Sequence, residues 1–275
     1  MNAAGSGSTP SDPPVQFLDV SGGRVAYTDE GEGPVLVMVH GIPGRPQDFR
    51  WLAAALNEDF RVVRIGMPGF VGTDEALGTP ALQERLGDFV ARTLEALQLE
   101  DVTLVGHSMG GPSTLVASVL SPRVRRLVLL ASAGLSPHRL YRRSRPDITA
   151  RMLRVPGLRR VLRPVLELGF RASGFPAAIP DRERQRSIFV AGAYDFETMR
   201  GFASRVNVPV LQAWTKDDPM VEPAIGRALH EVLGSEFVEF ERGGHNLQKS
   251  HAVALGERIR QFARETAVAR QDSRS

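Results

Sequence analysis

One stretch decides the fold of this chain, Val102–Gly111, which reads VTLVGHSMGG. Its apolar half is typical of a buried strand, and the Gly-x-Ser-x-Gly pattern that follows is typical of a sharp turn from a strand into a helix. Gly106 and Gly110 leave room for the strand and the helix to approach each other closely. Because such a turn pushes the serine hydroxyl out of the sheet, we predict that Ser108 is a nucleophile. The alternative is a plain glycine-rich turn, since five-residue patterns of this kind also occur by chance.

A second glycine-containing loop follows another apolar run. Val35–Val39 reads VLVMV, which is typical of a strand covered on both faces in a parallel sheet, and the loop His40–Gly44 (HGIPG) comes next. Together the two loops resemble those of the α/β-hydrolase fold family, in which a His-Gly loop after an early strand donates an oxyanion N–H group. The resemblance implies that Ile42 supplies this N–H. Met109, at the start of the helix after Ser108, is the candidate for the other N–H.

Either loop has a purely structural alternative, in which the glycines and the proline only turn the chain. In the His-Gly loop, we expect His40 to brace the backbone by hydrogen bonding rather than to take part in chemistry.

The resemblance implies the chain order nucleophile, acid, base, which tells where the acid lies. The late apolar segment Val208–Trp214 reads as a strand and is followed by TKDDP at residues 215–219. In the family, the acid commonly lies three residues after a glycine that closes this strand, often just before a proline. Thr215 stands at the glycine position here, which favours Asp218 as the acid. Asp217 is the alternative.

A histidine on the next loop is the candidate base. The strand-like segment Phe237–Phe240 is followed by a glycine-rich turn, Glu241–Asn246, that contains His245. This loop belongs to the same carboxyl end of the expected sheet as Ser108 and Asp218. The remaining histidines lie in the two oxyanion loops, in an arginine-rich segment, or in helix-like stretches: His40, His107, His138, His230 and His251.

These residues together predict a reaction. A serine is a poor nucleophile unless a base removes its proton and a third group orients that base. We therefore expect His245, oriented by Asp218, to activate Ser108 for acyl-enzyme formation, which makes the chain a serine hydrolase that cleaves a carboxylic ester or a related acyl compound. Hydrolysis of C–C bonds, lactones or thioesters and acyl transfer use the same three side chains and stay open. A non-catalytic ligand-binding member of the fold is the alternative from another class.

Apolar strands alternate with helix-like segments along the chain, which predicts an α/β fold with a mostly parallel central sheet flanked by helices. The resemblance implies an inserted helical cap in addition. The expected strands are 17–20 and 24–28, which form a hairpin around Ser21–Gly23, and then 35–39, 61–65, 102–107, 124–130, 208–214 and 237–240. The expected helices are 47–56, 81–97, the segment after Ser108, and 248–268.

Three regions are expected along the chain. Residues 1–14 are rich in Gly, Ser and Pro and predict a flexible tail rather than a signal peptide. Residues 15–134 and 206–275 predict the core. Residues 135–205, where the alternation stops, predict the helical cap.

The expected cap is strongly basic, with only Asp147 as a counterion over the arginine-rich span: Arg139, Arg142, Arg143, Arg145, Arg151, Arg154, Arg159, Arg160 and Arg163. Two interpretations stay open, a surface that attracts anions and a solvated exterior in an arginine-rich protein. Apolar residues interleave with the arginines: Leu153, Val155, Leu158, Val161, Leu162, Val165 and Leu166. They favour an apolar lid face above the site, and hence a small-molecule substrate with an apolar acyl or aromatic part.

The loop at residues 66–73 (GMPGFVGT) occupies the place where members of the family carry an Asp-x-Pro-Gly-x-Gly-x-Ser-like turn. Gly66 replaces the aspartate and Val71 the second glycine. We expect a structural role for this loop, with Phe70 lining the substrate pocket.

Composition excludes several classes of protein. The 275 residues are 42% hydrophobic, enough for one large core, and contain no cysteine, which excludes a disulfide scaffold, a thiolate nucleophile and Cys-ligated zinc. No apolar stretch reaches the ~18 residues of a membrane span. No nucleic-acid motif, dinucleotide fingerprint, metal site or cofactor site is recognisable. We expect a cytoplasmic protein that needs no metal or cofactor.

Overall fold

The apolar run before Ser108 forms β5 (Val102–His107), a strand in which every residue is buried. In the computed structural model, which describes residues 9–272, β5 pairs in parallel with β3 (Val35–Val39) on one side and with β6 (Val124–Leu130) on the other. Neighbouring strands pair with its backbone on both sides and helices cover both of its faces, so most of its side chains are apolar or small, with His107 at its end as the exception.

The described residues form one eight-stranded sheet with the order β1-β2-β4-β3-β5-β6-β7-β8. The first two pairings, β1 with β2 and β2 with β4, are antiparallel, and all the others are parallel. The other strands are β1 (Gln16–Val20), β2 (Gly23–Glu30), β4 (Arg61–Ile65), β7 (Val210–Thr215) and β8 (Glu236–Phe240).

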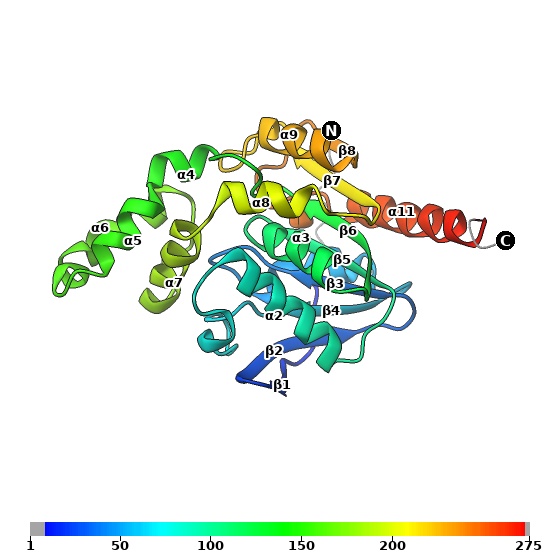
Figure 1. Cartoon of the computed structure of the whole chain (residues 1–275), viewed down its shortest axis with the longest axis horizontal. Helices are drawn as coiled ribbons and strands as arrows, with labels where there is room; N and C mark the ends of the chain where they lie inside the picture. The colour runs from blue at the N-terminus through cyan, green and yellow to red at the C-terminus, as the bar shows by residue number, and fades with distance from the viewer. Residues whose placement is uncertain (1–8, 273–275) are drawn as a thin grey trace.

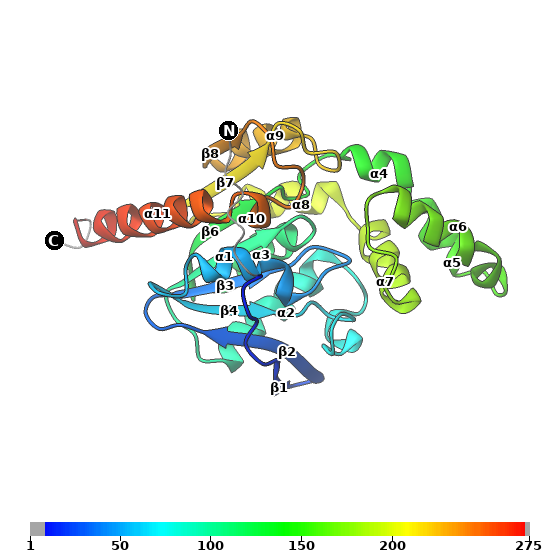
Figure 2. The same ribbon diagram turned by 180° about the vertical axis from the view of Figure 1, so that it is seen from behind.

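Helices connect these strands and cover both faces of the sheet (Figures 1 and 2). Those outside the insertion are η1 (Pro46–Phe49), α1 (Arg50–Ala54), η2 (Glu75–Gly78), α2 (Gln83–Ala96), α3 (Gly110–Leu120), α9 (Pro223–Leu233), α10 (Leu247–Ser250) and α11 (Ala252–Asp272). Between β6 and β7 lie α4 (Arg139–Ser144), α5 (Pro146–Leu153), α6 (Leu158–Ala172), α7 (Asp181–Gly192) and α8 (Phe196–Ala203).

Two hydrophobic clusters fill the space between the sheet and its helices. Successive strand residues point to opposite faces, so Val37 belongs to the cluster under α2 and α3, whereas Met38 belongs to the cluster under α1 and α11. Leu104 and Val105 of β5 divide in the same way. The sheet is therefore the middle of three layers, with helices packed on both of its faces. The loops at the carboxyl ends of β3, β5, β7 and β8 are not needed for this packing and can carry functional residues.

The predicted fold class is confirmed, including the helical insertion between β6 and β7. Two predicted helices are each divided: residues 46–54 form the short pieces η1 and α1, and the final helix breaks at His251 between α10 and α11. No helix among residues 9–272 combines the length and the apolarity that crossing a membrane requires.

The predicted tail, residues 1–14, falls partly outside the described residues, since the description begins at residue 9. Residues 9–14 lie in irregular structure, and Asp12 there contacts the core. Its carboxylate lies 2.8 Å from Nη1 of Arg64, whose side chain is only 1% exposed, and 3.0 Å from Nη2 of Arg50. The carboxylate of Glu30 pairs with Nη2 of Arg64 at 2.7 Å. The described part of the N-terminal segment is therefore fastened to β4.

Candidate active site

Ser108 lies on the turn between β5 and α3, in a left-handed backbone conformation with a φ of 53°. Such a conformation costs a non-glycine residue about 1–3 kcal/mol and persists only where its surroundings impose it. Here the N–H of Ser108 donates to the carbonyl of Leu130 at 3.0 Å, and its own carbonyl accepts from the N–H groups of Gly111 and Ala133. These bonds keep the half-buried side chain at the edge of the sheet.

The close packing around Ser108 requires glycine at the positions on either side of it. A Cβ at Gly106 would lie 2.3 Å from Oγ1 of Thr114, and one at Gly110 would lie 2.3 Å from the carbonyl oxygen of Val39. Both distances are too short for a real side chain. The elements β5, α3 and the end of β3 therefore approach each other this closely only because both positions are glycine. The interpretation of the two glycines made from the sequence agrees with this packing.

The structure brings Ser108, His245 and Asp218 together in one chain of hydrogen bonds. Oγ of Ser108 lies 2.9 Å from Nε2 of His245, and Nδ1 of His245 lies 2.8 Å from Oδ2 of Asp218. Because a carboxylate only accepts, Nδ1 carries the proton, and Nε2 of the neutral ring is free to accept from the serine hydroxyl. His245 is 8% exposed and Asp218 1%, so both lie largely out of solvent.

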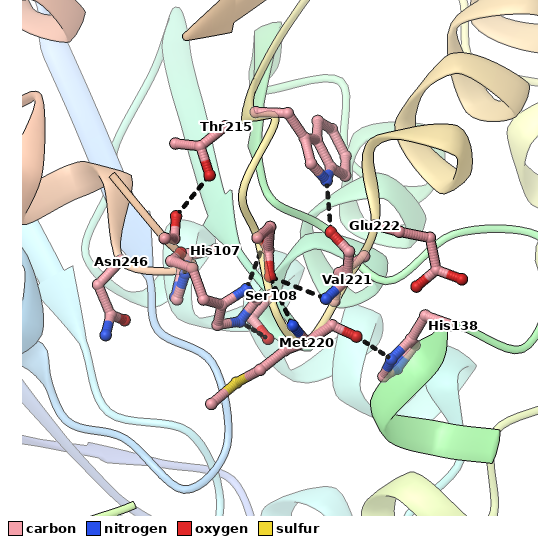
Figure 3. A network of polar contacts seen from close by, with 12 residues as sticks. His107, Ser108, His138, Thr215, Met220, Val221, Glu222 and Asn246 are labelled. Carbon is pink, nitrogen blue, oxygen red and sulfur yellow. Dashed lines mark hydrogen bonds and ion pairs between the residues drawn. The ribbon is translucent and has the colours of Figure 1, made fainter. Parts of the chain in front are cut away.

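The two adjacent aspartates have different partners. Oδ1 of Asp218 accepts from the N–H groups of Met220 and Val221, at 2.8 and 2.9 Å, which fixes the carboxylate toward the imidazole (Figure 3). Asp217 is exposed, and its carboxylate accepts instead from the N–H groups of Gly244 and Gly243, at 2.8 and 3.2 Å. These hydrogen bonds lower the pKa of Asp217. Asp218 thus contacts the histidine, and Asp217 holds the loop that carries it.

Two further residues support the histidine loop, and sequence reasoning assigned neither of them this role. The hydroxyl of Thr215 donates to the carbonyl of Gly244 at 2.8 Å, so the residue that departs from the family's glycine makes a bond that glycine cannot make (Figure 3). Nε2 of His107 lies 3.0 Å from the carbonyl of His245. Burial lowers the pKa of His107 to about 3, so its ring is neutral and Nε2 carries the donated hydrogen.

The loop that carries Ile42 approaches Ser108, and Met109 follows Ser108 directly in the chain. A Cβ at Gly41 would lie 2.8 Å from Cβ of Ser108, which shows how closely the loop after β3 approaches the serine. Within residues 9–272, the hydrogen bonds of the backbone include none donated by the N–H of Ile42 or of Met109. The role of both N–H groups as oxyanion donors stays a prediction.

His40 braces this loop, as expected. Its Nε2 accepts from the N–H of Met67 at 2.9 Å, so Nδ1 is the donor, and it bonds the carbonyl of Gly41 at 2.6 Å. Burial lowers the pKa of His40. Phe70 is 1% exposed and meets the ring of His40 edge-on, with 5.9 Å between the centroids. The aromatic ring therefore supports the His-Gly loop, and its contact with a substrate stays a prediction.

The insertion α4–α8 is tied to the site through the loop that carries Asp218. The guanidinium of Arg139 donates to the carbonyl of Asp218 at 3.0 Å, and the N–H of Leu140 donates to the carbonyl of Met220 at 3.0 Å. Glu222 accepts from the N–H of Arg139 and from the guanidinium of Arg142, both at 2.6 Å. The first helix of the insertion is thus bonded to the acid loop.

The residues of the expected apolar lid face have different surroundings in the structure. Leu153, Leu162 and Leu166 pack with Ala150 and Ile188 in a hydrophobic cluster inside the insertion. Leu158 is half-buried, and the remaining side chains of the expected face are more than half exposed to solvent: Val155, Val161 and Val165. An apolar pattern on a helix does not tell which of its sides packs inward, and the contact of the exposed residues with a substrate stays a prediction.

Residues 9–272 contain no cluster of three or more His, Cys, Asp or Glu side chains that would hold a metal ion.

Comparisons with known proteins agree with this architecture. A sequence model described as alpha/beta hydrolase family matches residues 36–258. The chain is 25% identical to an uncharacterized hydrolase, YugF, of Bacillus subtilis, over 90% of this chain and 97% of that protein. It is 26% identical to a 2-hydroxy-6-oxononadienedioate/2-hydroxy-6-oxononatrienedioate hydrolase of Paraburkholderia phymatum, over 87% of this chain and 90% of that protein.

Solved structures share the fold at low sequence identity. An esterase of Exiguobacterium antarcticum superposes with a TM-score of 0.71 at 20% identity, over 90% of this chain and 98% of that chain. An enol-lactonase of Burkholderia xenovorans superposes with a TM-score of 0.70 at 22% identity, over 90% of this chain and 99% of that chain.

Proposed function

This chain belongs to the alpha/beta hydrolase family, and from that premise we propose that it is a serine hydrolase that cleaves a carboxylic ester or a related acyl compound through an acyl-enzyme on Ser108. The observation that carries the proposal is the pair of hydrogen bonds that joins Ser108 to His245 at 2.9 Å and His245 to Asp218 at 2.8 Å. A nucleophile, a base and a residue that orients the base are the three parts that such chemistry needs.

The proposed reaction starts from a neutral His245 and a protonated Ser108. Nε2 of His245 takes the hydroxyl proton as Oγ of Ser108 bonds to the carbonyl carbon, and the carbonyl electron pair moves to oxygen. The N–H groups of Ile42 and Met109 stabilise that oxyanion. The tetrahedral intermediate then expels the alcohol, which receives the proton from His245. Water next gives a proton to His245 and attacks the acyl carbon, and His245 then returns that proton to the departing Oγ, which releases the acid and restores Ser108.

A fluorophosphonate probe tests the nucleophile directly. We expect covalent labelling at Ser108, identified by peptide mass analysis, and no labelling of the Ser108→Ala variant. Ser113 offers a matched control, because it is a second serine near the nucleophile in the chain but is buried within α3. Labelling should persist in Ser113→Ala. Failure of the intact chain to react would remove the proposal in favour of a ligand-binding member of the fold.

A panel of p-nitrophenyl esters of graded acyl length then measures turnover and sizes the pocket. We expect Ser108→Ala to lower kcat by about four orders of magnitude or more. Because the proposed substrate has an apolar acyl or aromatic part, kcat/KM is expected to rise from the acetate to longer or aromatic acyl groups. A panel on which the intact chain and Ser108→Ala hydrolyse at the same rate would contradict the mechanism.

The same three side chains support a second candidate, cleavage of a C–C bond or of a lactone. The relatives named above favour it, since they include a hydrolase named for 2-hydroxy-6-oxo dicarboxylates and an enol-lactonase. A 2-hydroxy-6-oxo dienoate and an enol-lactone added to the ester panel decide between the candidates. A kcat/KM higher for either of them than for every ester would favour the second.

A further inference from the structure

Large apolar side chains that face solvent are concentrated in one part of the insertion. Among residues 9–272, twelve large hydrophobic side chains are exposed, and six of them lie between residues 148 and 168, on α5, on α6 and in the turn between them. They are Ile148, Met152, Val155, Val161, Val165 and Leu168. Figures 1 and 2 show α5 and α6 at the end of the molecule farthest from the sheet.

Their spacing puts these side chains on helix faces rather than scattering them. Val161, Val165 and Leu168 follow each other at intervals of four and three residues, so they share one face of α6, and they are 68%, 64% and 67% exposed. A different side of α6, with Leu162 and Leu166, packs into the cluster inside the insertion. The apolar arc of α6 is thus wider than the insertion needs for its own packing.

Arginines accompany this apolar surface. From residue 148 to residue 168 the chain carries five arginines and a single acidic residue, Glu167. All five arginines are exposed: Arg151, Arg154, Arg159, Arg160 and Arg163. A second copy of this chain fits the surface poorly, because a symmetric contact would bring the two sets of arginines against each other. An anionic surface with an apolar interior complements both features, since guanidinium groups bond phosphates and the valines and Leu168 enter the acyl region.

We propose that the α5–α6 hairpin is a peripheral docking surface for an anionic phospholipid bilayer. The apolar face of α6 inserts at the level of the acyl chains just below the headgroups, while the surrounding arginines contact the phosphates. This inference goes beyond the proposed hydrolase function and does not depend on it, because it uses no residue of the candidate active site. Binding is therefore measured separately from turnover.

Cosedimentation with vesicles tests the apolar part of the surface. We expect the full chain to sediment with vesicles of phosphatidylglycerol and phosphatidylcholine, and the variant V161S/V165S/L168S to partition about tenfold more weakly. The matched control is V253S/V232S/L120S, which removes three exposed apolar side chains from the core and leaves binding unchanged. Circular dichroism and the thermal midpoint establish that both variants are folded. Equal partitioning of the two triple variants would overturn the proposal.

Charge variants test the anionic part. We expect R160Q/R163Q to weaken partitioning severalfold and to reduce its loss on addition of salt, whereas R85Q/R264Q, which removes two exposed arginines of the core, does neither. Two results would overturn the proposal. One is equal binding to vesicles of phosphatidylcholine alone. The other is a dimer in sedimentation velocity that V161S/V165S/L168S abolishes, because it would identify a second copy as the occupant.

Discussion

The two adjacent aspartates that the sequence offers as the acid have different roles in the structure. Asp218 bonds Nδ1 of His245, whereas Asp217 bonds the backbone of Gly243 and Gly244. Asp218→Asn removes the carboxylate that holds the imidazole in its productive tautomer, so we expect kcat on a soluble ester to fall by about 10³–10⁴-fold. Asp217→Asn keeps an oxygen that accepts from one glycine N–H, and the expected loss of kcat is less than about tenfold. Equal losses in the two variants would contradict this division.

His107 makes the stability of the fold depend on pH. Burial lowers its pKa to about 3, below the ordinary histidine value of about 6.5. Above pH ~6.5 neither state of the chain protonates it. Between these two values the unfolded chain binds a proton that the folded chain does not, so the free energy of unfolding falls as the pH falls, by about 1.4 kcal/mol per pH unit.

His107→Gln removes this titration and keeps a donor for the carbonyl of His245. Comparing urea unfolding at pH 7 and pH 4.5, we expect the intact chain to lose about 2.5 kcal/mol more stability on acidification than His107→Gln loses. His138, whose pKa burial lowers to about 4, remains in both chains and contributes equally to both. The same loss of stability in both chains would mean that His107 is protonated in the folded state.

At the scale of elements, Glu222 ties α4 to the acid loop. It accepts from the backbone of Arg139 and from the side chain of Arg142, and Arg139 in turn donates to the carbonyl of Asp218. We expect Glu222→Ala to lower the free energy of unfolding by about 1–2 kcal/mol. Since small displacements of catalytic groups are costly, kcat should fall by about tenfold as well.

The exposed pair Arg145–Asp147, in the same part of the insertion, is the control for Glu222. Asp147→Ala should change the free energy of unfolding by less than about 0.5 kcal/mol, because an exposed ion pair contributes little. It should leave kcat unchanged. If Glu222→Ala has the kcat of Asp147→Ala, α4 does not position the acid loop.

Elements and their functional loops differ in how far the sequence predicts them. The glycines around Ser108 and the Gly-Gly-His turn are local signals, so they identify their loops without knowledge of the fold. Thr215 and His107 act on Gly244 and His245, whose nearness depends on β7 and β8 pairing and on the order of the whole sheet. No local pattern carries that information. For a related reason the sequence does not show which apolar side of α6 faces solvent, because the neighbouring helices determine which side is covered.

For the whole molecule, the contact of Asp12 with Arg64 fastens the N-terminal segment to the sheet. The guanidinium of Arg64 is buried and is balanced by Asp12 and Glu30. Asp12→Ala leaves part of that charge uncompensated, so we expect the free energy of unfolding in urea to fall by about 2 kcal/mol. Asp88→Ala, which breaks an exposed i,i+4 pair with Arg92, should cost less than about 0.5 kcal/mol. Similar costs for both variants would show that the segment does not stabilise the fold.

The bond between Ser108 and His245 joins positions 137 residues apart in the chain. Closing so long a separation requires the entropy of the intervening chain to be overcome before the bond contributes any stability. In the function we propose, Ser108 is therefore activated only after β8 has joined the sheet and brought the His245 loop to Ser108, so a nascent or half-folded copy of the chain does not yet react with acyl compounds.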